Sequence, residues 1–403
     1  MNVPALKTSE LPPAIVLGGG HNALSIARRL GARGVAVHAL NHVGTDVTRS
    51  RFARTILLGG ENPFHLEAAE FLLGKESDHL RGAVLLVASD EGLQLVAAHR
   101  PALEARFELD LSDPEAQLKM LDKLATCHAA REAGVPAPNF WTVSTVEDAE
   151  AIRETILFPL IVKPHRSYLF EAKYGKKFLD VADFDGLADA LALVQSAGTG
   201  ALLMEKIPGP DSDLCSYYTY LDENGEALFD FTKRIIRRFP KNMGLATHHV
   251  TDEIPELREP SLRLFQHVGL RGVANVEFKR DARDGVLKLI ECNARFTAAN
   301  SLVAKCGLDL AWFVYCRIVG LPLPDMTRYR SGVKLWDPPR DFKAFRELRR
   351  LGELRTGEWL KHIAGPQTFP VFAITDPWPS VCRTVSQVRK LVAPRRSQEL
   401  GSS

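Results

Sequence analysis

The sequence predicts an α/β protein in which a parallel-sheet domain precedes a larger α+β region. Its 403 residues exceed what one hydrophobic core usually covers, so we expect two or three domains. In the first part, short apolar runs alternate with segments of helical spacing, which is typical of a parallel sheet covered by helices on both faces. Beyond about residue 115 the pattern changes and comes to include a meander of strands.

The composition indicates a globular protein that acts on small molecules. Hydrophobic residues make up 45% of the chain and charged residues 25%, as in soluble globular proteins. A net charge of +2 is too small to neutralise the phosphates along a nucleic acid, so we expect no nucleic-acid partner. The most apolar long stretch, residues 308–324, is interrupted by Asp309 and Arg317, so we expect no membrane span.

Two further features favour a cytoplasmic location. Residues 1–13 lack the apolar core of a signal peptide. The six cysteines form no CxxC pair and have no regular spacing, which argues against a zinc ribbon and against a disulfide framework. We interpret them as small buried apolar residues in a reducing compartment.

The first domain is expected to cover residues 1–115 and to open with a βαβ unit. The elements that the pattern predicts are a strand at 14–17, a helix at 22–30, and strands at 35–40, 55–58 and 83–88 with helices between them. Asp113-Pro114 then opens a new helix, because proline is favoured in the first turn.

The region that follows mixes helices with neighbouring strands up to about residue 325. It is expected to hold helices at 115–132, 146–156, 184–197 and 257–268, and strands at 140–143, 159–164, 178–182, 201–205, 214–221 and 227–236. Residues 326–403 mix helical and irregular pieces, and from Ser397 onward we expect disorder. Their role stays open between capping the active site, supporting a dimer and completing the core.

A β-hairpin that carries two carboxylates is the most informative feature of the sequence. Residues 273–280 and 286–295 are rich in β-forming residues and flank the polar link 281–285. Glu277 lies on the first strand and Glu291 on the second.

Side chains alternate along a strand, so Glu291, Asn293 and Arg295 point to one face. Depending on register, Glu277 faces Leu289 or Glu291, which brings the two carboxylates within roughly 5–8 Å. Like charges this close need neutralising, and Mg²⁺ favours carboxylates, an amide oxygen and nucleotide phosphates. The alternative is a solvent-facing hairpin with scattered charges.

The segment Gly18-Gly-Gly20-His-Asn-Ala23 fits the G-x-G-x-x-A dinucleotide fingerprint between a strand and a helix. Glycines let the backbone approach a phosphate at a helix N-terminus. The acidic ribose contact expected at the end of the second strand is missing, however, and Asn41 and His42 occupy that place. We therefore favour a structural or other small-ligand role for this turn over NAD or FAD binding.

Two lysines and a strand end complete the candidate motifs. Lys163 ends the apolar strand Pro159–Pro164, and because a buried lysine is costly unless paired, we expect it to reach a carboxylate or a phosphate. Lys123, taken alone, is interpreted as a surface residue of a helix. The strand that ends in Met204-Glu-Lys-Ile-Pro-Gly209 has carboxylates at Glu205, Asp211 and Asp213. By itself this segment fits equally well a loop with solvated acids.

Along the chain, four of these features follow one another: Lys123, Lys163, the strand end at Met204–Gly209, and the hairpin with Glu277 and Glu291. This order resembles the ATP-grasp superfamily over residues 115–325 or so. The resemblance implies a Rossmann-like domain, 1–115, and a two-lobed ATP-grasp domain, 116–325, with a central lobe at 116–200 and a C-terminal lobe at 201–325. Within the superfamily, three segments resemble carboxylate–amine ligases related to D-aspartate ligase, namely Ser216–Tyr220, Phe231–Arg234 and Ala274–Lys279.

The resemblance implies ATP and Mg²⁺ as cofactors, with Mn²⁺ as an alternative metal. For the nucleotide, phosphates would be held by Lys123 and Lys163, adenine would be read by the backbone of Glu205, Lys206 and Ile207, and ribose would be bound by Asp211 in preference to Asp213. For the chemistry, Glu277, Glu291 and Asn293 would hold two Mg²⁺ ions, and Arg295 would steady the carboxylate or acyl-phosphate oxygens. Lys233 would contact the γ-phosphate, and Lys163 would neutralise charge together with Mg²⁺ and Arg295.

The function implied is a ligase that activates a small-molecule carboxylate as an acyl phosphate and joins it to an amine. One alternative is a dinucleotide-dependent oxidoreductase that uses Gly18–Ala23, and the other is a nucleotide-binding or scaffold protein without turnover. Neither the acid nor the amine can be identified from the sequence. The oligomeric state is also open, with a homodimer as the usual expectation.

Two segments depart from the pattern of the superfamily. Many relatives have a Ser/Gly-rich segment after the strand lysine, whereas here residues 165–177 carry Lys173, Lys176 and Lys177 as candidate cationic cover for phosphates. The pair His248-His249 lies where the acceptor is expected, and we interpret it as part of a polar loop rather than a metal site.

Overall fold

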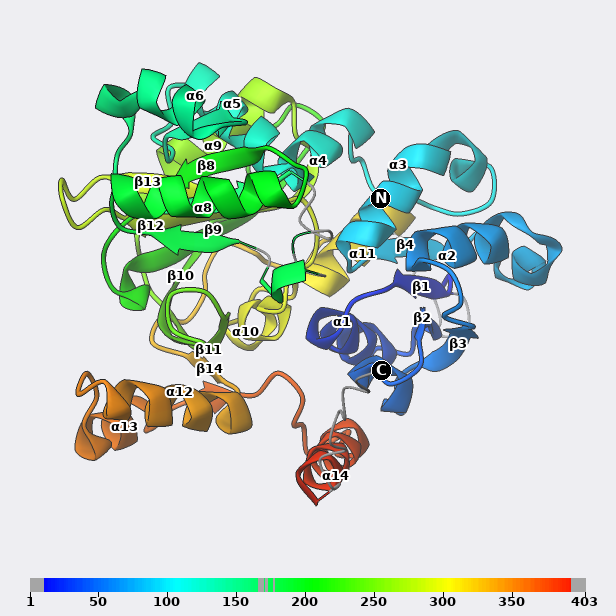
Figure 1. Ribbon diagram of the computed structural model, residues 1–403. Helices are drawn as coiled ribbons and strands as arrows, with labels where there is room; N and C mark the ends of the chain where they lie inside the picture. Colours follow the sequence, from blue (N-terminus) through cyan, green and yellow to red (C-terminus); the bar gives the residue numbers. More distant parts are fainter. Residues whose placement is uncertain (1–10, 166–169, 171–172, 177, 393–403) are drawn as a thin grey trace, which may run out of the picture.

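The computed structural model describes residues 11–165, 170, 173–176 and 178–392, and these form three β-sheets with helices packed around them (Figure 1). The expected disorder from Ser397 and the expected role of Lys177 concern residues outside this description. Within the described ranges, every helix is too short or too polar to cross a membrane.

The first sheet is parallel and has the order β3-β2-β1-β4. Its strands are β1 (Ala14–Leu17), β2 (Val37–His42), β3 (Arg54–Leu58) and β4 (Val84–Val87), and its connections contain α1 (His21–Gly31), η2 (Asp46–Arg49), α2 (Phe64–Leu73) and η3 (Lys75–Leu80), with α3 (Asp90–Glu104) after β4. Alternate residues of β1 enter two separate cores, Val16 with α1 and Leu17 with α2. The predicted parallel sheet with helices on both faces is therefore confirmed.

A second, antiparallel sheet has the order β5-β8-β6-β7. It contains β5 (Phe140–Val143), β6 (Leu160–Pro164), β7 (Leu179–Val181) and β8 (Ala201–Glu205), with α6 (Val146–Ala151), η4 (Arg153–Thr155) and α8 (Phe184–Ser196) in the connections. One face of this sheet packs its apolar side chains against α8, as Val162 and Leu191 show by sharing one core. The opposite face of the sheet, on which Lys163 lies, is not part of this core.

The helix expected at 115–132 is two helices, α4 (Pro114–Leu121) and α5 (Lys123–Glu132). Asp122 has extended backbone angles, and its side chain accepts a hydrogen bond from Ala125 N at 2.8 Å. The prediction was wrong here because aspartate satisfies the free N–H groups of a new helix and so favours a helix start. The break makes Lys123 the first residue of α5.

The third sheet has seven strands in the order β13-β12-β9-β10-β11-β14-β15. All its pairs are antiparallel except β14 with β15. Its strands are β9 (Leu214–Leu221), β10 (Phe231–Phe239), β11 (Leu245–Thr251), β12 (Gly272–Arg280), β13 (Leu287–Asn293), β14 (Lys334–Trp336) and β15 (Gln367–Thr368), and the neighbouring helices are η5 (Asp211–Asp213), η6 (Pro255–Leu257) and α9 (Arg258–Val268).

Segments late in the chain pack against the first sheet and complete the third. After the hairpin come α10 (Asn300–Lys305) and α11 (Leu310–Val319), and Tyr315 of α11 shares a core with Val16 of β1 (Figure 1). The last segment supplies β14 and β15 together with α12 (Pro338–Arg350), α13 (Thr356–His362) and α14 (Trp378–Val392). Residues 334–336 thus complete the sheet, one of the roles that the sequence left open.

A buried ion pair attaches α12 to the sheet. Asp341 accepts hydrogen bonds from Arg237 through both carboxylate oxygens, at 2.8 and 2.9 Å, and also from Thr247, Trp336 and Trp359. Both charged groups are almost completely buried. Five donated hydrogen bonds fix the orientation of this carboxylate and hold the start of α12 on β10 and β11.

Candidate active site

A cavity of about 390 Å³ opens over one face of the seven-stranded sheet. Its floor is formed by side chains from five strands, namely Tyr218, Lys233, Ile235, His249, Glu277, Ile290 and Glu291. The remaining lining comes from the start of α1, the start of α5, the β10–β11 turn, residues 297–299 and the last segment. The cavity therefore gathers parts of the chain that are hundreds of residues apart in the sequence.

A row of polar side chains crosses the sheet beneath this cavity. The register pairs Glu291 with Glu277, Glu277 with Ser216, and Ser216 with Lys233. A bulge between Glu277 and the next residue brings the two glutamates opposite one another, the second of the two registers that the sequence allowed. Side chains that face each other in this way have Cβ atoms about 4.5–5.5 Å apart.

Burial and the charges of neighbouring residues in this row shift the pKa of Glu277. Burial raises the pKa of its carboxyl group, the nearby Lys233 ammonium lowers it, and the Glu291 charge raises it again. Asn293 lies two pairs further along the ladder and donates to Asn275 Oδ1 at 3.4 Å. Within the described ranges no group of three or more His, Cys, Asp or Glu side chains is placed to hold a metal ion, and the candidate ligands in this row are two carboxylates and an amide.

Lys233 is buried at the other end of the row. Its Nζ donates to Ser216 Oγ at 2.9 Å and lies 5.7 Å from the centre of the Tyr218 ring. Desolvation lowers the pKa of this ammonium, and the charge of Glu277 opposes that shift. A buried cation beside a carboxylate pair is suited to meet an incoming anionic group.

Lys123 approaches the row from α5. Its Nζ lies 3.5 Å from Glu291 Oε2, and both side chains are about half exposed. The interpretation of Lys123 as a plain surface residue is therefore incomplete, since it lines the cavity beside a carboxylate.

Lys163 differs from its predicted state. Its side chain is exposed on β6, and in the described part of the chain it has no hydrogen-bond or ion-pair partner. The expectation of a buried lysine was wrong because Leu160 and Val162 face the α8 core, while its contact with a carboxylate or a phosphate stays a prediction. Alternation along the strand turns Lys163 to the opposite face.

The strand end at Glu205 is held by a buried charge cluster. Glu205 Oε2 accepts from both the backbone N–H and the side-chain amide of Asn139, at 3.0 Å each, and Oε1 binds the Arg283 guanidinium. Arg283 and Lys288 also pair with Asp281, whose pKa is held well below its usual range mainly by Arg283. The Glu205 side chain thus joins the small sheet to the β12–β13 hairpin.

The backbone after Glu205 leaves two polar groups free. Lys206 N–H donates to Pro159 O, and Ile207 O accepts from Lys279 Nζ at 2.9 Å. Among the described residues, Lys206 C=O and Ile207 N–H have no partner. They face a second cavity of about 360 Å³, which Lys279 also lines.

Strand β12 connects the two cavities. Lys279 lines the cavity beside the free backbone groups, and Glu277, two residues earlier, lines the larger one. Residues i and i+2 of a strand are about 7 Å apart. An elongated ligand can therefore reach from the free backbone groups to the carboxylate pair along this strand.

The two candidate ribose acids differ in their surroundings. Asp211 is buried and accepts from Arg238 Nε and from Asn242 N, both at 3.0 Å. Asp213 is partly exposed, and its carboxylate has no partner in the described portion of the chain.

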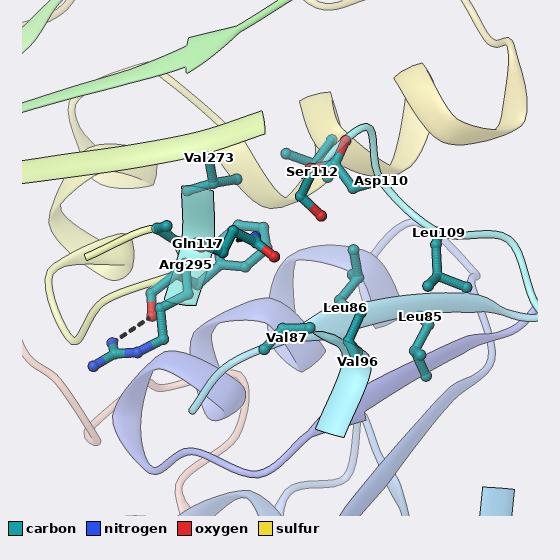
Figure 2. A pocket seen from close by; sticks show the side chains of 13 residues that line it. Leu85, Leu86, Val87, Val96, Leu109, Asp110, Ser112, Gln117, Val273 and Arg295 are labelled. Carbon is teal, nitrogen blue, oxygen red and sulfur yellow. Dashed lines mark hydrogen bonds between the residues drawn. The ribbon is translucent and has the colours of Figure 1, made fainter. Parts of the chain in front are cut away.

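Arg295 lies outside the larger cavity. Its Nε donates to Asp90 Oδ1 at 2.5 Å, and Nη1 donates to Phe296 O at 3.3 Å. Figure 2 shows the guanidinium directed away from Leu86 and the other side chains of a neighbouring small cavity. That cavity of about 30 Å³ has room for only one or two water molecules and is too small to be a substrate site.

The glycine-rich turn is filled by protein atoms. A Cβ on Gly18 would lie 2.3 Å from Ser89 Oγ, and one on Gly19 would lie 2.6 Å from Ala88 O. Asn41 donates to Gly19 O at 2.8 Å, and the Asn22 side chain accepts from Gly20 N. The first two glycines therefore permit close packing of this turn against the start of α3.

The remaining predictions concern the polar segments. Lys173 Nζ donates to Ser196 O at 2.8 Å, so its side chain is held by the end of α8. The pair His248-His249 belongs to β11 rather than to a polar loop, a correction that reflects its pairing with β10 and β14. His248 Nδ1 contacts Arg237 at 2.7 Å, whereas His249 lines the larger cavity.

Several residues of the site were not among the site residues predicted from the sequence. Ser216, Lys279, Arg283 and Arg340 reach it only through strand pairing or through the last segment. The alternation of Lys279 with Glu277 along one strand was the one available indication.

Comparison with known proteins identifies relatives of both the sequence and the fold. Residues 242–325 match the model of the carbamoyl-phosphate synthase L chain, ATP binding domain. D-aspartate ligase of Enterococcus faecium (strain Aus0004) is 25% identical over 333 residues, which cover 77% of each chain.

Two solved structures share the fold at low sequence identity. N5-carboxyaminoimidazole synthetase from Staphylococcus aureus, complexed with ADP, superposes with a TM-score of 0.57 at 16% identity, over 81% of this chain and 82% of the other. A biotin carboxylase complex from Campylobacter jejuni superposes with a TM-score of 0.59 at 18% identity, over 79% and 73% of the two chains.

Proposed function

Because the chain belongs to the ATP-grasp superfamily and resembles its carboxylate–amine ligases, we propose that it forms an amide through an acyl phosphate. A carboxylate oxygen of the acid attacks the γ-phosphorus of ATP and ADP leaves. The amine then attacks the acyl carbon, phosphate leaves, and the amine loses a proton. The observation that carries the proposal is the row of Glu291, Glu277, Ser216 and Lys233 beneath one cavity.

The nucleotide would begin at the backbone that follows Glu205. Adenine presents a donor at its 6-amino group and an acceptor at N1, which match the free Lys206 C=O and Ile207 N–H. Asp211 and Asp213 are the two candidates for the ribose hydroxyls. Asp213 is the freer of them, because Asp211 already holds Arg238 and the β10–β11 turn.

The carboxylate pair fits a divalent metal. Glu277, Glu291 and Asn293 would hold Mg²⁺, because burial and like charge disfavour the ionised form of Glu277 until a cation compensates it. Bound there, Mg²⁺ would neutralise the charge on the phosphates.

The lysines and Arg295 would complete the charge neutralisation. Lys233 would contact the γ-phosphate from its buried position, and Lys123 would bind a phosphate oxygen beside Glu291. Lys163 projects from the face of the small sheet opposite α8 and would cover the phosphates from that side. Arg295 would steady the carboxylate only after it leaves Asp90.

Thermal unfolding with and without ATP and Mg²⁺ tests the proposal, beside the same titration with NAD⁺, NADH and FAD. A ligand that binds only the folded state stabilises it by about 2.7 kcal/mol at a hundredfold excess over Kd. We expect a magnesium-dependent rise in Tm with ATP alone. A rise with a dinucleotide and none with ATP would overturn the proposal and favour a role for the Gly18–Ala23 turn.

A further inference from the structure

Arg340 is a cation without a counter-ion in the lining of the larger cavity. It lies in the first turn of α12, is partly buried, and lines the cavity with Leu335 and Pro370. Across the described residues it has no hydrogen-bond or ion-pair partner. The two nearest acids along the chain are already engaged, since Asp341 accepts from Arg237 and Asp337 accepts from Arg383 Nη2 at 3.0 Å.

The other basic groups of the cavity, His249 apart, already have partners. These pairs are Lys123 with Glu291, Lys233 with Ser216, Arg238 with Asp211, and His21 with Asp46. Arg340 therefore differs from every one of them in having five N–H donors available to a ligand.

Arg340 is also held in place by its neighbour. Asp341 is fixed by Arg237, Thr247 and two tryptophans, so the first turn of α12 is anchored to the sheet. A guanidinium on an anchored backbone loses less freedom when it binds a carboxylate, which favours affinity.

A second unpartnered group lies beside this end of the cavity. His249 Nδ1 is buried and has no hydrogen-bond partner in the described part of the protein. His249 pairs with Leu335 of β14, the strand that leads to Arg340. Burial and the nearby Lys233 lower the pKa of His249 well below its usual value, so the imidazole is neutral and can bond a polar ligand group.

The strand order separates Arg340 from the carboxylate pair. Glu277 lies on β12, and Arg340 follows β14, which is four strands away in the sheet. Four spacings of about 4.8 Å separate strand β12 from strand β14 by about 19 Å, while Glu277 and Arg340 line the same cavity. A phosphate held at the carboxylate pair therefore leaves Arg340 free for a different anionic group.

We infer that Arg340, assisted by His249, binds a non-reacting carboxylate of one of the two substrates. That substrate is a dicarboxylic acid if it is the acid, or an amino acid if it is the amine. The inference rests on the proposed function for the reaction, but the carboxylate site itself is independent of nucleotide chemistry.

The test uses binding to the full chain, measured by thermal unfolding with and without a non-hydrolysable ATP analogue and Mg²⁺. The probes are the common amino acids in both enantiomers, their carboxamides, and the dicarboxylates succinate and glutarate. The variants are Arg340→Gln, Arg340→Lys and a control, Arg346→Gln, which removes an exposed arginine of the same helix.

We expect at least one carboxylate probe to raise the Tm of the wild type and of Arg346→Gln, and its carboxamide to be weaker. Arg340→Gln should weaken that probe at least tenfold while the Tm without ligand and the nucleotide shift stay unchanged, and Arg340→Lys should restore part of the affinity. Binding of succinate or glutarate assigns the site to the acid, and binding of monocarboxylate amino acids alone assigns it to the amine.

Two results would overturn the inference: no probe shifts the wild type, or Arg340→Gln binds the probes as the wild type does. Loss of the nucleotide shift in the wild type, with Arg340-dependent carboxylate binding intact, would instead reject the proposed function and leave this site standing.

Discussion

Glu277 and Glu291 occupy directly opposite positions of the β12–β13 ladder, with Lys233 and Lys123 as the nearest cations on either side. Two carboxylates that face each other destabilise a sheet unless a cation compensates them. The unliganded protein compensates them only in part, because Lys123 is half exposed and lies 3.5 Å from Glu291. The pair is therefore expected to lower stability without metal and to support activity with it.

The first prediction concerns turnover. Glu291→Gln keeps the shape of the side chain and removes one charge of the pair, so it should abolish ATP turnover while the fold stays intact. Phosphate release with MgATP and a mixture of amino acids measures this, with the circular dichroism spectrum as the check on folding. Glu226→Gln, at an exposed turn, is the matched control. ATP consumption by Glu291→Gln at the wild-type rate would reject the metal assignment.

The second prediction concerns pH. The raised pKa of Glu277 means that the folded state binds its proton more tightly than the unfolded state does. Without ligand, the free energy of unfolding should therefore fall as pH rises from about the ordinary value of 4.5 through the raised pKa. Mg²⁺ needs the ionised form, so its stabilising effect with ATP should grow over the same range.

The difference in Tm between wild type and Glu277→Gln, followed against pH, isolates this group from all others that titrate. A difference that does not change with pH would show that the environment of Glu277 is not as described.

The third prediction concerns the charge cluster at the strand end. Glu205→Gln leaves the Arg283 guanidinium without one of its two carboxylates and should cost about 1.5–3 kcal/mol of unfolding free energy. The urea midpoint should fall accordingly. ATP binding should weaken as well, because the free backbone groups proposed to bind adenine belong to the two residues after Glu205. A midpoint equal to that of Glu226→Gln would contradict a structural role for Glu205.

The fourth prediction compares the stability of alanine variants at Gly19 and Gly20 of the glycine-rich turn with that of a variant at Gly44, which follows β2. Gly19→Ala meets both a positive φ of 80° and the Ala88 carbonyl, whereas Gly44→Ala meets a positive φ of 93° in open space. Gly20 has open space and no positive φ but is the N-cap of α1, where glycine is preferred to alanine, so Gly20→Ala should cost less stability than Gly19→Ala but is not expected to be neutral. Thermal unfolding should rank Gly19→Ala as least stable, and all three should keep the ATP affinity of the wild type. A loss of nucleotide binding in Gly20→Ala would instead assign the turn to the ligand.

Most strands and the β12–β13 hairpin could be predicted because a strand or a turn depends mainly on a few consecutive residues. The sequence could not decide whether Glu277 pairs with Leu289 or with Glu291. The structure has a β-bulge in which Ile290 is the extra, unpaired residue, and the sequence alone does not reveal a bulge. The expected burial of Lys163 was wrong because the covering element, α8, lies on the other face.

Long-range pairings set the rest of the site. The three residues of β14 are too few to show a period, yet they bring Leu335 and then Arg340 to the cavity. The attachment of Arg283 to Glu205 joins positions 78 residues apart in the chain, which no local pattern predicts.

Calorimetric titration of ATP into the wild type, Glu291→Gln and Glu226→Gln, each with and without Mg²⁺, measures whether the carboxylate pair holds the metal that binds the nucleotide. We expect Mg²⁺ to strengthen ATP binding at least tenfold in the wild type and in Glu226→Gln, and this gain to disappear in Glu291→Gln. An undiminished gain in Glu291→Gln, or no ATP binding by the wild type, would show that the pair does not bind the metal of MgATP.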